Sequence, residues 1–244
     1  MARFDRGDTR RRLLLAIVSV LGLLLVVAVA LWQVSRARCF VLVGAVTCRV
    51  ETSAPLVALT FDDGPTQLGV NQILPELERH SVHATFFLTG REATQRPELV
   101  RAIVAAGHEV GNHSFSHVRM AMHSSAFYKD EIMRTDALLR GAGVPAPSLF
   151  RPPYGKKLIG LPLALARHHY RMIMWDVEDP LDAETPQAYA DSVVREARPG
   201  SIILMHIMYS GDAIARAALP LVVRGLAARG LRIVTVGELL RRRG

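Results

Sequence analysis

Cysteine is scarce in this 244-residue chain, which contains only Cys39 and Cys48. A thiolate metal site and a thiol nucleophile are therefore excluded from everything beyond residue 48. The two cysteines bracket the apolar segments 40–43 and 45–47, which meet at Gly44. This pattern predicts a small hairpin whose ends a disulfide ties together in an oxidising compartment. The alternative is a pair of free thiols packed as small hydrophobic side chains.

The chain also lacks any stripe of basic side chains interleaved with aromatic ones, the pattern typical of a nucleic-acid-binding face. Its formal net charge is +8, but residues 1–12 carry five Arg against two Asp, and residues 241–243 add three more Arg. Only about +2 therefore remains for the residues between these two ends. We expect no nucleic-acid partner and interpret the basic ends as membrane-proximal.

One long hydrophobic run is present, from Leu13 to Trp32, and only Ser19 and Gly22 in it are not strongly apolar. A helix of this length spans the hydrocarbon core of a bilayer. Because most of the flanking Arg precede the run, residues 1–12 are expected in the cytoplasm and the rest of the chain outside. The alternative is a cleaved signal peptide that ends at residues 28–30.

The sequence thus divides into four expected segments. They are a basic cytoplasmic N-terminus (1–12), a transmembrane signal-anchor helix (13–34), a linker with the cysteine pair (35–53) and one large domain (54–244). The large domain is expected outside the cytoplasm, in a periplasmic or extracellular position, held to the cytoplasmic membrane by the helix.

From residue 54 the chain alternates between apolar, β-rich runs and amphipathic stretches with helical spacing. The expected strands are 56–61, 83–88, 108–112, 148–151, 171–177, 201–206 and 232–236. The expected helices are 70–79, 97–106, 126–140, 186–197 and 214–229. This alternation predicts an α/β fold with a parallel barrel or barrel-like sheet, whose functional residues follow the strands.

Two adjacent carboxylates, Asp62 and Asp63, follow the first apolar run and precede a Gly64-Pro65 turn. A buried charge is costly unless it is paired or bound to a metal, so the pair has no obvious packing role. At the end of a strand the two side chains can face one cavity in different roles. The alternative is that they cap the following helix or form an Asx turn before Pro65.

His113 and His117 follow the third run and are four residues apart. One helical turn would place both imidazoles on the same face, a spacing used by paired zinc ligands. One added carboxylate would complete a three-ligand set with an open position for water, as in catalytic zinc sites. The alternative is a pair of surface or helix-terminal histidines.

Other polar residues gather after the later runs. Those that stand out are Arg151 to Gly155 after the fourth run, Asp176, Glu178, Asp179 and Asp182 after the fifth, and His206 at the end of the sixth. The second run ends in residues 89–91, which suggest no chemistry. Because parallel strands end at the same edge of a sheet, these residues predict one active site.

Five motifs in order resemble those of the polysaccharide deacetylase family, also called the NodB homology domain or carbohydrate esterase family four. They are residues 60–65, 113–117, 151–155, 179–182 and 204–206. The resemblance covers about residues 54–240. It implies a distorted (β/α) barrel with about seven parallel strands, here preceded by one N-terminal transmembrane helix, with residues 54–244 as the catalytic domain.

The resemblance implies a role for each matched residue. The implied metal ligands are Asp63, His113 and His117. The implied catalytic residues are Asp62 as general base, Arg151 to orient it, His206 as general acid and Asp179 as its partner. The implied substrate-binding residues are Tyr154, beside a backbone N–H of the oxyanion site, and Leu204 in the acetyl pocket. The implied cofactor is a divalent metal, most often Zn²⁺, with Co²⁺, Ni²⁺, Fe²⁺ and Mn²⁺ as alternatives.

Two positions depart from the family pattern. Ile207 stands where the family usually has Asp or Ser, and Ala183 stands where it usually has Trp. Both are expected near the sugar, so they bear on substrate preference more than on the reaction. Within the fourth motif, Glu178 is an alternative to Asp179 as the partner of His206, although Asp179 has the better spacing to Asp182.

The expected function is metal-dependent hydrolysis of N-acetyl groups, with O-acetyl groups as an alternative, on an envelope or extracellular polysaccharide that contains N-acetylglucosamine. The expected partners are this N-acetylated polysaccharide or oligosaccharide and, through the N-terminal helix, the membrane. Two other functions are weighed against it: hydrolysis of a non-glycan amide on the same fold, and glycan binding by a catalytically silent envelope protein. The filled catalytic and ligand positions argue against the silent protein.

Overall fold

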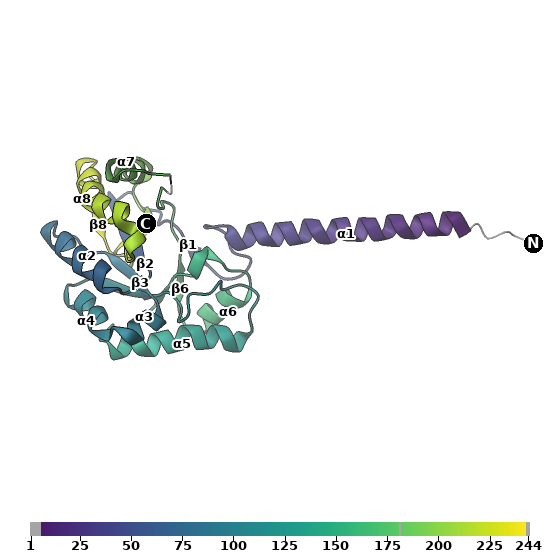
Figure 1. The fold of residues 1–244 in the computed structure, drawn as a ribbon, viewed down its shortest axis with the longest axis horizontal. Helices are drawn as coiled ribbons and strands as arrows, with labels where there is room; N and C mark the ends of the chain where they lie inside the picture. Colours follow the sequence, from purple (N-terminus) through teal and green to yellow (C-terminus); the bar gives the residue numbers. More distant parts are fainter. Residues whose placement is uncertain (1–5, 181, 243–244) are drawn as a thin grey trace, which may run out of the picture.

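The computed structural model describes residues 6–180 and 182–242. Residues 1–5 of the basic N-terminus, residue 181 of the fourth motif, and Arg243 lie outside the described residues. Helix α1 (Arg6–Arg36) extends away from the rest of the chain as a single long rod (Figure 1). Its segment from Arg10 to Arg36 is long and apolar enough to cross a membrane, by length and composition.

The strands of the described residues form one parallel sheet. They are β1 (Val46–Thr47), β2 (Leu56–Asp62), β3 (Thr85–Leu88), β4 (Glu109–Asn112), β5 (Leu149–Phe150), β6 (Arg171–Ile173), β7 (Ile202–His206) and β8 (Arg232–Val234). The order is β1-β6-β5-β4-β3-β2-β7, and β8 also pairs with β2. Strands β2 to β8 confirm the seven predicted runs.

Strand β2 pairs with three other strands, β3, β7 and β8. Ala58 lies opposite Ile202 of β7 on one edge and opposite Val234 of β8 on the other. On the edge of β2 that pairs with β8 at residues 56–58, β3 is the partner at residues 60–62. An isolated bridge between Val177 and Ile203 brings the chain after β6 back to β7. The sheet therefore curls into the distorted barrel that the sequence predicts.

Helices surround the sheet (Figure 1). They are α2 (Gln67–Arg79), α3 (Gly90–Gln95), α4 (Pro97–Ala105), α5 (Ser125–Gly141), α6 (Gly160–Arg167), α7 (Pro186–Glu196), α8 (Ala213–Ala228) and α9 (Val236–Leu240), with 3-10 turns η1 (Pro153–Gly155) and η2 (Ser210–Asp212). The five predicted helices are present. Helices α3, α6 and α9 were not predicted, because helices of 6, 8 and 5 residues complete too few turns to display a helical period.

Both faces of the sheet are buried, and the alternation along β2 separates two cores. Leu59 and Phe61 belong to the core that packs against α2, α4, α7 and α8. Leu56 and Ala58 belong to the core inside the curl, together with Trp175. Because alternate side chains point to opposite faces, Thr60 and Asp62 share the inner face. A strand buried on both sides reads as a continuous apolar run, which explains why the strands are visible in the sequence.

The segment that follows α1 is fixed to the barrel. Cys39 and Cys48 form a disulfide, and Thr47 lies opposite Ile173 in the parallel pairing of β1 with β6. The predicted hairpin around Gly44 is wrong, because only residues 46–47 become a strand and their partner is β6. Val41, Val46 and Cys48 pack against the core of the barrel, whereas Phe40 and Leu42 stay exposed.

We expect Gly200→Ala to destabilise the fold by about 2–4 kcal/mol. Gly200 has φ +84°, and an added Cβ would lie 1.8 Å from the Val50 carbonyl oxygen. Gly141→Ala is the matched control, because nothing lies within 4 Å of its added Cβ. Urea unfolding of the detergent-solubilised chain measures both. A loss below about 1 kcal/mol for Gly200→Ala would contradict the tight approach.

Candidate active site

The turn after β2 places two neighbouring carboxylates in one cavity. Asp62 is the last residue of β2, and Asp63 and Gly64 then adopt left-handed φ values of 74° and 72°. The change of backbone direction turns the Asp63 side chain toward the same edge that Asp62 faces. Thr66, not an aspartate, caps α2 by accepting a hydrogen bond from the Gly69 N–H. The aspartates are thus not needed to cap the helix.

An irregular loop brings His113 and His117 together. The predicted helical turn is wrong, because residues 113–117 contain no helix, and Ser114 and His117 have φ values of 65° and 57°. Asn112 Oδ1 accepts the Ser114 N–H at 2.9 Å, which holds the first turn of the loop. The imidazole rings still meet, with centroids 5.0 Å apart.

A buried carboxylate supports this loop from below. Glu131 in α5 is 4% exposed and accepts hydrogen bonds from the N–H groups of Phe115 and Ser116, each at 2.9 Å. Its other oxygen accepts the Ser116 hydroxyl at 2.7 Å. Three donors therefore satisfy this charge inside the protein, so it can fix the loop without binding a cation.

Asp63, His113 and His117 form a candidate metal centre. Their ligand atoms all lie within 4.8 Å of one another. Asp63 Oδ1 is 3.1 Å from His117 Nε2 and 3.7 Å from His113 Nε2. Two ligands that each lie about 2.1 Å from a tetrahedral metal are separated by roughly these distances. The donor set of two imidazoles and one carboxylate fits a divalent transition metal.

The electrostatics of this centre also fit a cation. Burial and the charge of Asp62 raise the pKa of Asp63 to about 7 against the opposing effect of His206, so the protein only partly compensates an ionised Asp63. Burial lowers the pKa of His113 to about 4 and also lowers the pKa of His117, which leaves both rings neutral as metal ligands must be. His113 Nδ1 lies 2.8 Å from the Arg151 carbonyl oxygen, which leaves Nε2 as the lone-pair nitrogen facing Asp63.

Asp62 has a different partner from its neighbour. Arg151 is fully buried, and its Nη1 lies 2.7 Å from Asp62 Oδ1 and 2.8 Å from Thr60 Oγ1. Burial works to raise the pKa of Asp62, but Arg151 and the nearby histidines outweigh it and hold the pKa below its ordinary value. The second oxygen, Oδ2, remains 3.7 Å from His113 Nε2 and faces the metal centre. Asp62 is therefore an ionised acceptor beside the cavity.

His206 ends β7 directly opposite Asp62 of β2. Its Nδ1 is hydrogen bonded to Asp179 Oδ2, and its backbone N–H donates to Asp179 Oδ1 at 3.0 Å. The Tyr189 hydroxyl also donates to Asp179. Burial acts to lower the pKa of His206, but the hydrogen bond and charge of Asp179 with the nearby aspartates raise it to about 9.

The alternative partner, Glu178, points elsewhere. Glu178 accepts the Trp175 indole N–H at 2.8 Å and pairs with Arg38 at 3.2 Å. The structure therefore places Asp179, and not Glu178, against His206.

Tyr154 and Leu204 lie at the mouth and the floor of the site. Tyr154 has φ 56°, is 57% exposed, and its ring centroid lies 4.8 Å from that of His117. Leu204 is 3% exposed and lies opposite Thr60, so its side chain shares the inner face with Asp62 and His206. All nine residues singled out from the sequence are thus gathered at one edge of the barrel.

The two departures from the family pattern differ in their surroundings. Ala183 lines a cleft with Asp179 and His206, and its place near the sugar stays a prediction. The expectation for Ile207 is wrong, because Ile207 is fully buried in the core beneath α8. Only Ala183 is therefore placed to influence what the cleft accepts.

Three supporting residues were missed in the sequence. Glu131 carries a signal that could have revealed it, because it is a charged residue on the buried face of α5 beside Tyr128 and Ile132. Thr60 sits inside an apolar strand, where a hydroxyl is inconspicuous. Tyr189 packs on the core side of α7, and the sequence around it does not indicate that its hydroxyl donates to Asp179.

Comparisons with known proteins agree with this arrangement. The polysaccharide deacetylase family matches residues 49–173. A peptidoglycan-N-acetylglucosamine deacetylase of Bacillus cereus is 35% identical over 183 residues, which are 74% of this chain and 66% of that protein. The chain thus spans just under two thirds of that relative. A chitooligosaccharide deacetylase of Sinorhizobium fredii is 37% identical over 171 residues, 68% of this chain and 79% of that protein.

Solved structures share the fold. A pseudoenzyme of carbohydrate esterase family four from Bacillus anthracis has a TM-score of 0.74 and 29% identity, and the match covers 82% of this chain and 70% of that one. This neighbour shows that the fold alone does not decide activity. Family model, sequence relatives and fold agree, and we conclude that the chain belongs to the polysaccharide deacetylase family.

Proposed function

We propose that this chain is a metal-dependent hydrolase that removes N-acetyl groups from an envelope polysaccharide containing N-acetylglucosamine. One observation carries the proposal: an ionised carboxylate and a protonated imidazole, Asp62 and His206, lie opposite each other beside a three-donor metal centre. The activities named for the relatives, on peptidoglycan and on chitooligosaccharides, support this substrate class.

Asp63, His113 and His117 would hold the metal, with Zn²⁺ the best fit to the donors and Co²⁺, Ni²⁺, Fe²⁺ and Mn²⁺ also compatible. When bound, a divalent ion lowers the pKa of a water ligand and polarises a carbonyl oxygen. The surrounding residues keep the two histidines neutral and direct His113 Nε2 toward the cavity.

Asp62 is proposed as the general base. Arg151 occupies its Oδ1, and its free Oδ2 accepts a proton from the attacking water. The guanidinium also keeps Asp62 ionised, so the acceptor is available at neutral pH. The water oxygen then adds to the acetyl carbon, and the carbon–nitrogen bond breaks to release acetate.

His206 is proposed as the general acid. With Nδ1 on Asp179, its Nε2–H is the proton available to the amine nitrogen that leaves. A pKa raised to about 9 keeps His206 protonated at neutral pH. Leu204 and Tyr154 are proposed to line the pocket for the acetyl group, and a backbone N–H near Tyr154 is proposed to stabilise the oxyanion.

We also propose that α1 anchors the enzyme in the cytoplasmic membrane with the barrel outside. The apolar length of α1 and its Arg-rich start support this topology. A glycan of the cell envelope would then lie on the same side as the active site.

The full chain is expected to release acetate from N-acetylated glycan oligomers, and chelation followed by gel filtration should abolish the release. Added Zn²⁺ or Co²⁺ should restore it, because the three donors are preformed. A panel of peptidoglycan fragments, chitooligosaccharides and acetylated non-glycan amides identifies the substrate. Glycan binding without acetate release on any of them would favour the silent glycan-binding protein instead.

Asp62→Asn and Asp63→Asn are expected to separate the two carboxylates. Asp62→Asn should keep its metal and lose turnover by a factor of about 10²–10⁴, because an amide cannot accept the proton. Asp63→Asn should lose metal as well. Metal content and acetate release are compared per folded chain, since Asp62→Asn also leaves Arg151 buried without a counter-charge. An empty site in Asp62→Asn with a full one in Asp63→Asn would reverse the roles.

Asp179→Asn is expected to move the basic limb of the kcat–pH profile to lower pH by about one unit or more. Without the Asp179 charge, burial lowers the pKa of His206, and the acid loses its proton at a lower pH. Asp182→Asn is the matched control, because Asp182 is exposed and three residues away. Coincident profiles for Asp179→Asn and the wild type would argue against the acid role.

A further inference from the structure

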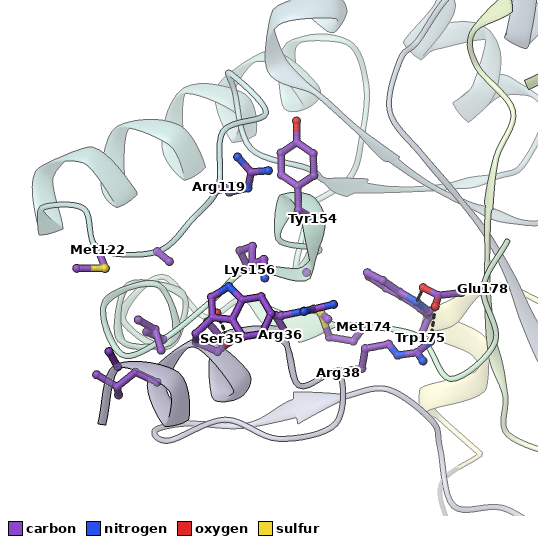
Figure 2. A pocket seen from close by; sticks show the side chains of 16 residues that line it. Ser35, Arg36, Arg38, Arg119, Met122, Tyr154, Lys156, Met174, Trp175 and Glu178 are labelled. Carbon is purple, nitrogen blue, oxygen red and sulfur yellow. Dashed lines mark hydrogen bonds and ion pairs between the residues drawn. The ribbon is translucent and has the colours of Figure 1, made fainter. Parts of the chain in front are cut away.

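A large cavity lies between the end of α1 and the barrel, outside the metal centre (Figure 2). Its volume is about 1150 Å³. Ala28, Leu31, Trp32 and Arg36 of α1 line one side. The barrel contributes the other side, including the labelled side chains of Arg119, Tyr154 and Lys156 (Figure 2). The cavity therefore has an apolar end along the helix and a basic end against the barrel.

The basic end carries positive charge without a matching carboxylate. In the part of the chain that the structure describes, no ion pair within 4.0 Å joins Arg36, Arg119 or Lys156 to an acidic side chain. Burial, Arg36 and Arg119 all lower the pKa of Lys156, as expected for cations that crowd one space. The one acidic lining residue, Glu178, is already paired with Arg38.

The cavity lies at the depth of lipid headgroups if α1 crosses the membrane as proposed. The apolar run from Leu13 ends at Trp32, and its length matches a hydrocarbon core of about 30 Å. Trp32 would then lie at the interface, where aromatic side chains are favoured. Arg36 lies one helical turn beyond it. Met122, which lines the barrel side of the cavity, is 90% exposed and would face the same headgroup region of the membrane.

Direct contacts hold the two walls of the cavity together. Lys157 is 1% exposed, its Nζ donates to the Ala37 carbonyl, and its backbone N–H donates to the Ser35 carbonyl at 3.4 Å. The disulfide from Cys39 then ties the next residues to the strand paired with β6. The end of α1 is therefore part of the barrel surface and not a free tether.

We propose that this cavity binds an anionic phospholipid of the leaflet nearest the barrel. Its phosphate would lie among Arg36, Arg119 and Lys156, and an acyl chain would follow Ala28 and Leu31. Guanidinium groups suit a phosphodiester because their N–H groups bind it in pairs. This inference rests on the membrane topology of the proposed function, but not on its chemistry.

The lipid site shares a residue with the active site. The Arg119 guanidinium lies 5.0 Å from the ring centroid of Tyr154, whose ring also packs against His117. A lipid phosphate held by Arg119 would keep the mouth of the active site at the membrane surface. The glycan within reach is then the material that lies next to the membrane.

Native mass spectrometry of the full chain in detergent, titrated with phosphatidylglycerol or phosphatidylcholine, tests the site. We expect one phosphatidylglycerol to be retained per chain and phosphatidylcholine to bind far more weakly. Arg119→Gln combined with Lys156→Gln should weaken phosphatidylglycerol binding by about 25-fold, since each basic residue contributes about fivefold. Arg119→Lys combined with Lys156→Arg should restore most of it.

The matched control is Arg171→Gln with Arg224→Gln, which removes the same charge from two exposed positions that do not line the cavity. Equal weakening by both pairs, or no preference between the two lipids, overturns the site. Displacement of the lipid by an equal concentration of glycerol 3-phosphate also overturns it, because that result identifies a soluble phosphate as the ligand. Acetate release plays no part in the readout, so loss of deacetylase activity and loss of lipid binding are separate outcomes.

Discussion

The buried ion pair between Arg151 and Asp62 holds this active site together. The guanidinium contacts Asp62 and Thr60 of β2 and also donates to the Met174 carbonyl at 3.2 Å, so one side chain joins β2 to the segment after β6. Its own carbonyl accepts from His113. Removing one partner of such a pair typically costs 3–5 kcal/mol, because the other charge stays buried. Asp62, His113 and the barrel wall therefore depend on a single residue.

This pair also explains how two identical neighbours acquire different properties. Asp62 has a full positive charge beside it, and its pKa falls. Asp63 has no guanidinium beside it, and burial and the charge of Asp62 outweigh the opposing effect of His206 and raise its pKa to about 7. The protein thus compensates one carboxylate internally and leaves the other to a ligand from outside. The left-handed turn at Asp63 and Gly64 is enough to separate the two environments.

Much of this arrangement is visible in the sequence, and the exceptions have physical causes. The strands can be recognised in the sequence because β2 and its neighbour β3 are buried on both faces and therefore consist of apolar runs. The positions of Asp62, Arg151 and His206 follow from the rule that parallel strands end at one edge. The prediction of a helical turn for His113 and His117 was wrong because Ser114 and His117 adopt positive φ values. The His117 N–H donates to Ser114 Oγ within this turn, and buried Glu131 accepts from the N–H groups of Phe115 and Ser116.

Other features depend on helices that fold back onto the preceding loops. Glu131 lies 16 residues after Phe115 and Tyr189 lies 10 residues after Asp179, so no short sequence pattern reveals these hydrogen bonds. Ile207 follows His206 in the chain, but its side chain alternates to the opposite, core-facing side of the sheet. Adjacency in sequence is therefore a poor guide to adjacency in a site built on strands.

If α1 anchors the chain as proposed, its short connection to the barrel limits how far the active site can lie from the membrane. Only Ala37 and Arg38 separate the end of α1 from the disulfide at Cys39, and each residue spans at most about 3.6 Å. With α1 in the membrane, the catalytic mouth has a fixed height and cannot sweep outward through the thickness of a wall. On the proposed topology, the enzyme would act on a thin layer of glycan at a set distance from the membrane.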